Sequence, residues 1–180
     1  MKKEIDNTLS ILNNGGIILY PTDTIWGIGC DATNEQAIKR IFKIKKRADN
    51  KALISLVANE NQLKNITGYI PDIDITSEPT TIIYPSVINL NKKILAEDGS
   101  AALRIVQDDF CKKVINEFGK AIVSTSANIS GSDSPKRFSE ITKEIKNNVD
   151  YIVNLQQKKL MTTPSKILKI EKDGRVTKIR

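Results

Sequence analysis

A cluster of hydroxyl and amide side chains follows a short apolar segment in the second half of the chain. Residues 124–131 read Ser-Thr-Ser-Ala-Asn-Ile-Ser-Gly and come directly after Ala121-Ile122-Val123. The apolar run is typical of a buried strand, and the Ser, Asn and Gly residues are typical of the turn that leaves it. Four hydroxyls and one carboxamide can line a site for a polar ligand. The alternative is an ordinary serine-rich turn.

Positive charge is concentrated between residues 39 and 51. This run holds seven cations against the single acidic residue Asp49, namely Lys39, Arg40, Lys43, Lys45, Lys46, Arg47 and Lys51. It therefore carries +6 of the net charge of +7, and the rest of the chain is close to neutral. Such a run indicates a phosphate or polyanion partner, and the alternative is a solvated helix face.

The basic run overlaps a predicted helix over residues 33–46. Thr33 and Gln36 have the spacing of a capping box, which predicts the start of the helix. Its apolar stripe begins at Ile38, and Lys45 occupies position i+7 of that stripe. An ammonium there either extends to solvent or projects into a cleft, where an anion would offset its desolvation. Lys45, with Arg47 just beyond the helix, is the best candidate pair for phosphate contacts.

A third polar segment interrupts a predicted strand near the N-terminus. Residues 19–29 read Leu-Tyr-Pro-Thr-Asp-Thr-Ile-Trp-Gly-Ile-Gly, so the strand breaks at Pro21 into hydroxyl and carboxylate groups. Open sheets bind ligands at strand ends, and the alternative is a turn with an Asx-type cap. Residues 27–32 also fit the dinucleotide pattern G-x-G-x-x-A. Because the preceding strand is interrupted and the following helix is cationic, a nicotinamide enzyme is a weak alternative.

The composition limits the chemistry that these residues can perform. The chain contains no histidine, which removes the usual zinc ligand and the usual general base near neutral pH. Serine hydrolase triads and most metallohydrolase sites are therefore disfavoured. Cys30 and Cys111 show no disulfide framework and no metal-binding spacing. Any chemistry rests on lysine, arginine, carboxylate, hydroxyl and backbone amide groups.

The elements that must position these groups predict one domain over residues 1–180, of the α/β (α+β) class, and the lack of a disulfide framework indicates the cytoplasm. Besides the basic helix, strands are predicted near residues 17–20, 52–57, 81–84, 101–106, 121–125 and 151–155, and helices near 60–66, 108–118 and 138–147. A final hairpin around Asp173-Gly174 makes the sheet mixed. No apolar stretch approaches the roughly 20 residues of a membrane helix, and no secretory signal is recognisable.

Taken together, the three segments resemble the YrdC family. The resemblance rests on Pro21 to Gly29, on Lys45-x-Arg47 with Lys51, and on Ser124 to Gly131, and it extends to Pro79-Thr80-Thr81-Ile82, Arg104 and Pro164-Ser165. This sequence departs from the family pattern at Trp26, Ala48, Ala52 and Lys166, where tyrosine, proline, proline and threonine are common. The end at Arg180 predicts the short form, without the extra C-terminal domain of longer members.

The resemblance implies a twisted mixed sheet with flanking helices around a basic concave cleft. It also implies a threonylcarbamoyl-AMP synthase, a nucleotidyltransferase that uses L-threonine, bicarbonate or CO2, and ATP with Mg²⁺. Its products would be pyrophosphate and threonylcarbamoyl-AMP for N6-threonylcarbamoyladenosine modification of tRNA. Positioning and charge neutralisation are the main demands of such a transfer. tRNA and tRNA-modifying proteins are further implied partners, and a membrane is not.

The resemblance further implies a role for each matching residue. Lys45 and Arg47 would be catalytic. The ATP-binding residues would be Arg47, Lys51, Ser124, Ser126, Asn128, Ser165 and Arg180, and the threonine-binding residues would be Thr24, Thr81 and Arg104. No protein ligand to a metal is expected, because substrate oxygens and water would hold the Mg²⁺ ion.

Two other functions use the same residues. The basic run over 39–51 could serve as an RNA-binding module without turnover, although an aromatic content of 5% counts against single-strand recognition. A carbamoyl transferase with another carbamoyl donor would need the same cations and hydroxyls.

Overall fold

The computed structural model describes residues 1–46 and 52–180. Within these ranges, nine strands form one sheet in the order β7-β1-β2-β6-β3-β5-β4-β8-β9. β1 pairs in parallel with β7, β3 with β5, and β4 with β8, whereas the other neighbours are antiparallel. The predicted mixed sheet is therefore confirmed.

The described elements alternate between strand and helix along much of the chain. In chain order they are α1 (Lys2–Asn13), β1 (Ile18–Tyr20), β2 (Gly27–Asp31), α2 (Glu35–Lys45), β3 (Ile54–Val57), α3 (Glu60–Thr67), β4 (Thr80–Tyr84), the 3-10 helix η1 (Lys92–Ile94), β5 (Ala101–Ile105), α4 (Asp109–Phe118), β6 (Ile122–Ser126), the 3-10 helix η2 (Phe138–Glu140), α5 (Lys143–Asn148), β7 (Tyr151–Ile152), β8 (Lys166–Ile170) and β9 (Val176–Lys178).

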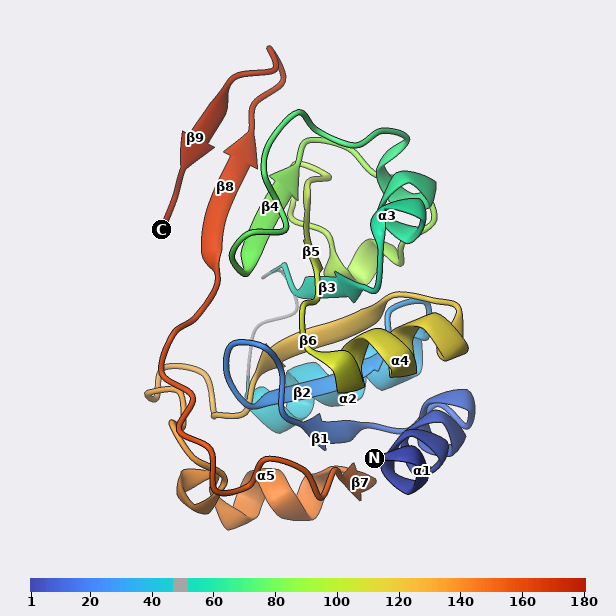
Figure 1. Ribbon diagram of the computed structural model, residues 1–180, viewed down its shortest axis with the longest axis vertical. Coiled ribbons are helices and arrows are strands. Elements are labelled where there is room, and N and C mark those ends of the chain that lie inside the picture. The colour runs from blue at the N-terminus through green and yellow to red at the C-terminus, as the bar shows by residue number, and fades with distance from the viewer. Residues whose placement is uncertain (47–51) are drawn as a thin grey trace.

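The two faces of the sheet pack against different helices. One face forms a core with α2, α3 and α5, to which Ile38 and Leu63 belong. The other face packs against α1 and α4 through residues such as Phe110, so that α2 and α4 lie on opposite sides of β2 (Figure 1). Burial of each such apolar side chain stabilises the fold by about 1.5–3 kcal/mol. Successive strand residues point to opposite faces, which places Leu103 in the first core and Arg104 on the second face.

The start of the basic helix differs from the prediction. Asn34, not Thr33, is the N-cap of α2, and its side-chain oxygen accepts a hydrogen bond from Ala37 N at 3.0 Å. The predicted capping box fails because Asp31 Oδ1 accepts both the backbone N–H and the hydroxyl of Thr33, at 2.7 and 2.6 Å. The hydroxyl of Thr33 is thus committed to the turn before the helix.

Three further segments differ from the sequence-based expectation. Residues 27–31, which include the two glycines of the dinucleotide pattern, form the fully buried strand β2. The helix predicted over 138–147 is divided into η2 and α5. α1 was not predicted, although Ile5, Leu9 and Leu12 have helical spacing and pack on the sheet.

Residues 153–165 carry the chain from β7 at one edge of the sheet to β8 near the other, as Figure 1 shows on the left of the molecule. The end of this connection, at Pro164 and Ser165, passes over the sheet face that carries Arg104 and lines a cavity there. Among the helices of the described residues, none combines the length and the apolar character needed to cross a membrane.

Candidate active site

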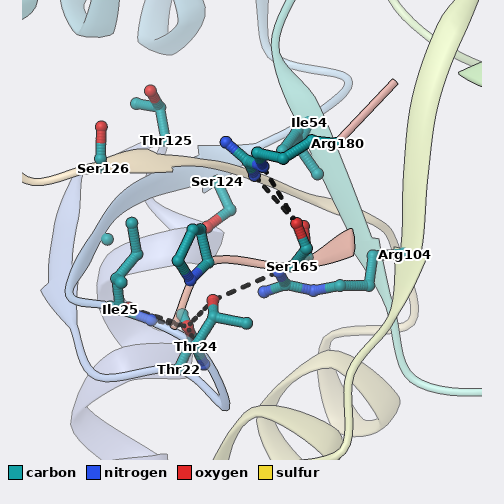
Figure 2. A pocket seen from close by; sticks show the side chains of 12 residues that line it. Thr22, Thr24, Ile25, Ile54, Arg104, Ser124, Thr125, Ser126, Ser165 and Arg180 are labelled. Atoms are coloured by element: carbon teal, nitrogen blue, oxygen red, sulfur yellow. Dashed lines mark hydrogen bonds between the residues drawn. The ribbon is translucent and has the colours of Figure 1, made fainter. Parts of the chain in front are cut away.

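A small cavity lies on the sheet face that carries Arg104. Its volume is about 60 Å³. The lining comes from the loop between β1 and β2, from the strands β2, β3, β5 and β6, from the segment that enters β8, and from the last residue: Thr22, Thr24, Ile25, Gly27, Ile54, Arg104, Ser124, Thr125, Ser126, Pro164, Ser165 and Arg180 (Figure 2). Polar side chains from segments far apart in sequence therefore line one cavity.

A larger cavity of about 530 Å³ adjoins the small one. The two share the lining residues Ile25, Ile54, Ser124, Thr125, Ser126, Pro164 and Arg180. The floor of the larger cavity is an apolar surface on three neighbouring strands, formed by Ala102, Ile83 and Ile167. Part of its wall is formed by Ser134, Lys136 and Met161. A ligand with one polar and one apolar part can span both spaces.

The small cavity is built around the buried guanidinium of Arg104. This side chain is 5% exposed, and its Nη2 lies 3.0 Å from Asp23 Oδ1. Its Nη1 donates to Thr24 Oγ1 at 3.2 Å, and Thr24 Oγ1 lies 3.0 Å from Thr22 Oγ1. Arg104 Nε is buried without a hydrogen-bond partner among the described residues. Since buried donors are nearly always paired, this N–H group suits an acceptor on a ligand.

Ser165 joins the wall of the cavity to the sheet. Its hydroxyl lies 2.8 Å from Thr81 Oγ1, and both groups are buried. Its carbonyl accepts hydrogen bonds from Arg180 Nε and Nη2, at 3.2 and 3.0 Å, as the dashed lines in Figure 2 show. Arg180 is thereby held at the boundary of the two cavities, where its charge faces the shared lining.

The two glycines of the dinucleotide pattern make room for an aromatic ring and for Ser124. A Cβ atom on Gly29 would lie 2.8 Å from Tyr20 Cε1, and a Cβ atom on Gly27 would lie 3.1 Å from Ser124 Oγ. The nicotinamide alternative loses its main support, because these glycines lie within a paired strand and not in a phosphate-binding turn. Burial raises the pKa of the Tyr20 phenol well above its usual range, so this group stays neutral.

Lys45 contacts the serine and asparagine turn and does not line either cavity. Its side chain is 2% exposed, and Nζ donates to Ser126 O at 2.5 Å, Asn128 O at 2.7 Å and Asn128 Oδ1 at 3.3 Å. Asn128 Oδ1 also accepts from Ser126 Oγ at 2.5 Å. Of the two predicted outcomes, solvent or a cleft, the structure shows neither, because the buried ammonium of Lys45 is paired with backbone carbonyls and not with a cavity. Its ammonium connects α2 to the end of β6, next to the cavities.

The structure brings most of the predicted site residues together. Thr24, Arg104, Ser124, Ser126, Ser165 and Arg180 line the small cavity, and Thr81 lines the larger one. Lys45 and Asn128 join the site through Ser126. Arg47 and Lys51 lie outside the described residues.

Sequence reasoning left six lining positions of the small cavity, Ile25 and Pro164 among them, and one anchoring residue without a role. Thr22 and Asp23 belong to the segment that signalled the site, but only Thr24 was assigned from it. Gly27, Ile54 and Thr125 also line the cavity. Gly27 and Thr125 lay within motifs quoted for the family resemblance, whereas nothing in the sequence around Ile54 signals a site.

Fold and site define an α/β protein whose mixed sheet carries a buried arginine and a hydroxyl-rich cavity beside a larger, partly apolar one. Residues 10–180 match the family model Sua5_yciO_yrdC, described as Telomere recombination. The chain belongs to this family, and the predicted resemblance is confirmed.

Curated relatives cover most of this chain. A protein of Methanocaldococcus jannaschii named putative threonylcarbamoyl-AMP synthase is 34% identical over 185 residues, which cover 99% of this chain and 86% of the relative. The threonylcarbamoyl-AMP synthase of Pseudoalteromonas translucida is 32% identical over 157 residues, covering 81% and 82% of the two chains.

Solved structures share the fold at lower sequence identity. P. abyssi Sua5 complexed with L-threonine superposes with a TM-score of 0.85 at 23% identity. This chain is covered completely but spans only 54% of the Sua5 chain. E. coli YciO superposes with a TM-score of 0.83 at 19% identity, covering 100% of this chain and 89% of YciO. The predicted fold class is thereby confirmed.

Proposed function

We propose that this protein is a threonylcarbamoyl-AMP synthase, as predicted from its sequence and as its curated relatives are named. The threonine amine condenses with bicarbonate and loses water, or adds to CO2 and loses a proton, to form a carbamate. A carbamate oxygen then attacks the α-phosphorus of ATP, the bond to the bridging oxygen breaks, and pyrophosphate leaves. The product supplies the threonylcarbamoyl group for N6-threonylcarbamoyladenosine in tRNA, and the cytoplasmic location stays a prediction.

The observation that carries this proposal is the polar cavity around Arg104 that opens into a larger, partly apolar one. In the proposed complex, threonine occupies the small cavity with its carboxylate on Arg104, whose Nε is buried and unpaired among the described residues. Arginine is suited to this role because its guanidinium is always charged and presents fixed donors. The hydroxyls of Thr22 and Thr24 border the same space.

The larger cavity is the proposed nucleotide site. The base and ribose would lie over the apolar floor of Ile83, Ala102 and Ile167, whose residues come from adjacent strands. The α-phosphate would then lie at the shared boundary, near Ser124 and Arg180. This arrangement brings the carbamate and the α-phosphate together, so that catalysis follows from proximity and charge neutralisation.

The β- and γ-phosphates are assigned to the basic segment. Arg47 and Lys51 remain predicted phosphate ligands, and Thr81, Ser126, Asn128 and Ser165 remain predicted contacts to substrate. The nucleotide is proposed to enter as its Mg²⁺ complex. In the part of the chain that the structure describes, no group of three His, Cys, Asp or Glu side chains is placed to hold a metal, so phosphate oxygens and water would provide most ligands of this ion.

Ion pairs on α2 favour the enzyme over an RNA-binding module. Three of the exposed cations of this helix and its C-cap are paired: Lys39 with Glu35, Arg40 with Asp150, and Lys46 with Glu144. Their charge is therefore partly neutralised, which weakens the patch as a polyanion site. Direct contact with tRNA and with tRNA-modifying proteins stays a prediction.

The test is pyrophosphate release by the purified protein. We expect release from ATP only when threonine and bicarbonate are both present. Lys39→Ala should match the wild type, because this side chain is 45% exposed and lies away from the cavities. Pyrophosphate release that is indifferent to threonine would refute the proposed function.

A further inference from the structure

We propose that Asp23 is a positioning residue for threonine binding, which sets the orientation of Arg104 and does not touch the substrate. The inference rests on the proposed function, because it takes the threonine carboxylate as the ligand of Arg104. Asp23 belongs to the loop between β1 and β2, but it is absent from the lining of both cavities. Its side chain is only 7% exposed.

Both carboxylate oxygens of Asp23 accept hydrogen bonds from the end of β5. Oδ1 accepts from Arg104 Nη2 at 3.0 Å, and Oδ2 accepts from the backbone N–H of Gln107 at 3.1 Å. One carboxylate thus ties the arginine side chain to the backbone three residues further along. Because a carboxylate is an acceptor at both oxygens, it satisfies the two donors together.

Asparagine at position 23 has the same shape but cannot satisfy both donors. In either orientation of the amide, its NH2 group faces the N–H of Arg104 or that of Gln107. The substitution also removes the charge that compensates a guanidinium only 5% exposed. An uncompensated buried charge moves toward solvent or a new partner, since it is costly to leave unpaired. Arg104 then loses its fixed direction.

The orientation of Arg104 matters because its side chain lines the small cavity. Nη2 is held by Asp23, and Nη1 donates to Thr24 Oγ1 at 3.2 Å. With these two bonds the plane of the guanidinium is fixed, and the unpaired Nε keeps one direction. A carboxylate that enters the cavity meets donors that are already oriented, which saves the cost of ordering them on binding. The nucleotide makes no use of this orientation.

The test compares Asp23→Asn with the wild type in steady-state pyrophosphate release. We expect the KM for threonine to rise about 10-fold to 100-fold, the range for loss of a hydrogen bond to a charged group. The KM for ATP should stay within about twofold of the wild-type value. Saturating threonine should restore kcat, because the contact between Arg104 and the carboxylate is equally strong in the ground state and the transition state. A merely structural role would instead lower kcat through a smaller folded fraction and leave both KM values unchanged, which would overturn the inference.

A change of ligand isolates the carboxylate. L-threoninol lacks this group but keeps the amine, the hydroxyl and the methyl group. In calorimetric titrations, the wild type should bind threonine more tightly than threoninol, and Asp23→Asn should lose most of this difference. Equal loss of affinity for both ligands would show that Asp23 does not act through the carboxylate.

If Asp23→Asn does not fold, the inference is tested by comparing Arg104→Gln with the double variant Arg104→Gln/Asp23→Asn. The double variant leaves neither buried charge of the pair without its partner, because both charges are removed. The two variants should have the same KM for threonine, since Asp23 acts through Arg104. A further loss in the double variant would refute the inference. If the wild type releases no threonine-dependent pyrophosphate, the proposed function fails. If the wild type is active and Asp23→Asn has the same KM for threonine, only the inference about Asp23 is refuted.

Discussion

Replacing Lys45 by methionine tests how the basic helix contributes to the site. The change removes the ammonium but keeps a side chain of similar length, so it separates charge and hydrogen bonding from packing. In the structure, Lys45 Nζ donates to Ser126 O and Asn128 O at 2.5 and 2.7 Å. The substitution therefore breaks the connection between the end of α2 and the turn that follows β6.

The expected loss of stability follows from the two carbonyls. Asn128 O loses its ammonium partner in a partly buried place, and an unsatisfied acceptor there costs at most about 1–3 kcal/mol. Ser126 O keeps a bond from Asn128 N at 2.9 Å, so its loss is smaller. Removing a buried ammonium also recovers part of its desolvation cost. We therefore expect a net loss of about 2 kcal/mol, and about 10²-fold in turnover, the size of effect seen when one electrostatic stabiliser is lost.

Urea denaturation measures the first quantity, and pyrophosphate release measures the second. With a denaturant slope of about 2 kcal/mol per molar, the urea midpoint should fall by about 1 M. Lys39→Met on the same helix is the matched control, because its exposed ion pair with Glu35 contributes well under 1 kcal/mol. If Lys45→Met is as stable as the control but inactive, Lys45 acts on phosphate and the structural connection is unimportant. Normal stability with normal turnover would refute both roles.

Two further predictions concern the sheet and its edge. Gly29→Ala places a methyl group 2.7 Å from a backbone carbonyl oxygen of β6, so we expect a loss of about 1–3 kcal/mol in urea denaturation, and an unchanged midpoint would contradict this close packing. Asp150 accepts hydrogen bonds from Arg40 at 2.9 Å and from a backbone N–H at 2.6 Å, which lower the pKa of its carboxyl group. Because the folded-state pKa lies below the unfolded-state pKa, its stabilisation is present above pH about 4 and disappears as the pH falls further. Asp150→Asn should therefore lower the free energy of unfolding at pH 7 and converge with the wild type as the pH falls below the folded-state pKa of Asp150, and a constant difference would contradict this explanation.

Local sequence determined the chemical groups of the site and the segments that carry them. The apolar run before Ser124 predicted β6, and the Asp173-Gly174 turn predicted the β8–β9 hairpin, since turn chemistry and hydrophobic pattern depend on near neighbours. The absence of histidine excluded whole classes of chemistry without any knowledge of the fold.

Other local signals were ambiguous because competing contacts, some of them tertiary, decide between their outcomes. The spacing of Gly27 and Gly29 suits a phosphate-binding turn as well as a strand, and only the ring of Tyr20, packed against Gly29, explains why side chains are absent there. Thr33 has the right spacing for a capping box, but Asp31 binds its hydroxyl first. The ring of Tyr20 reaches Gly29 through the pairing of β1 with β2, whereas Asp31 lies only two residues before Thr33 and competes locally.

By itself, the sequence determined that a cationic helix, a hydroxyl-rich turn and a Thr-Asp-Thr loop exist, and which functional groups they offer. Only the tertiary structure decided that β6 lies between β2 and β3, so that Ser124 meets the cavity of Arg104, and that Asp23 reaches the end of β5. The physical reason is that strand order and register are set by the burial of whole sheet faces, which sums contacts between residues distant in sequence. A local pattern specifies a strand but not its neighbours.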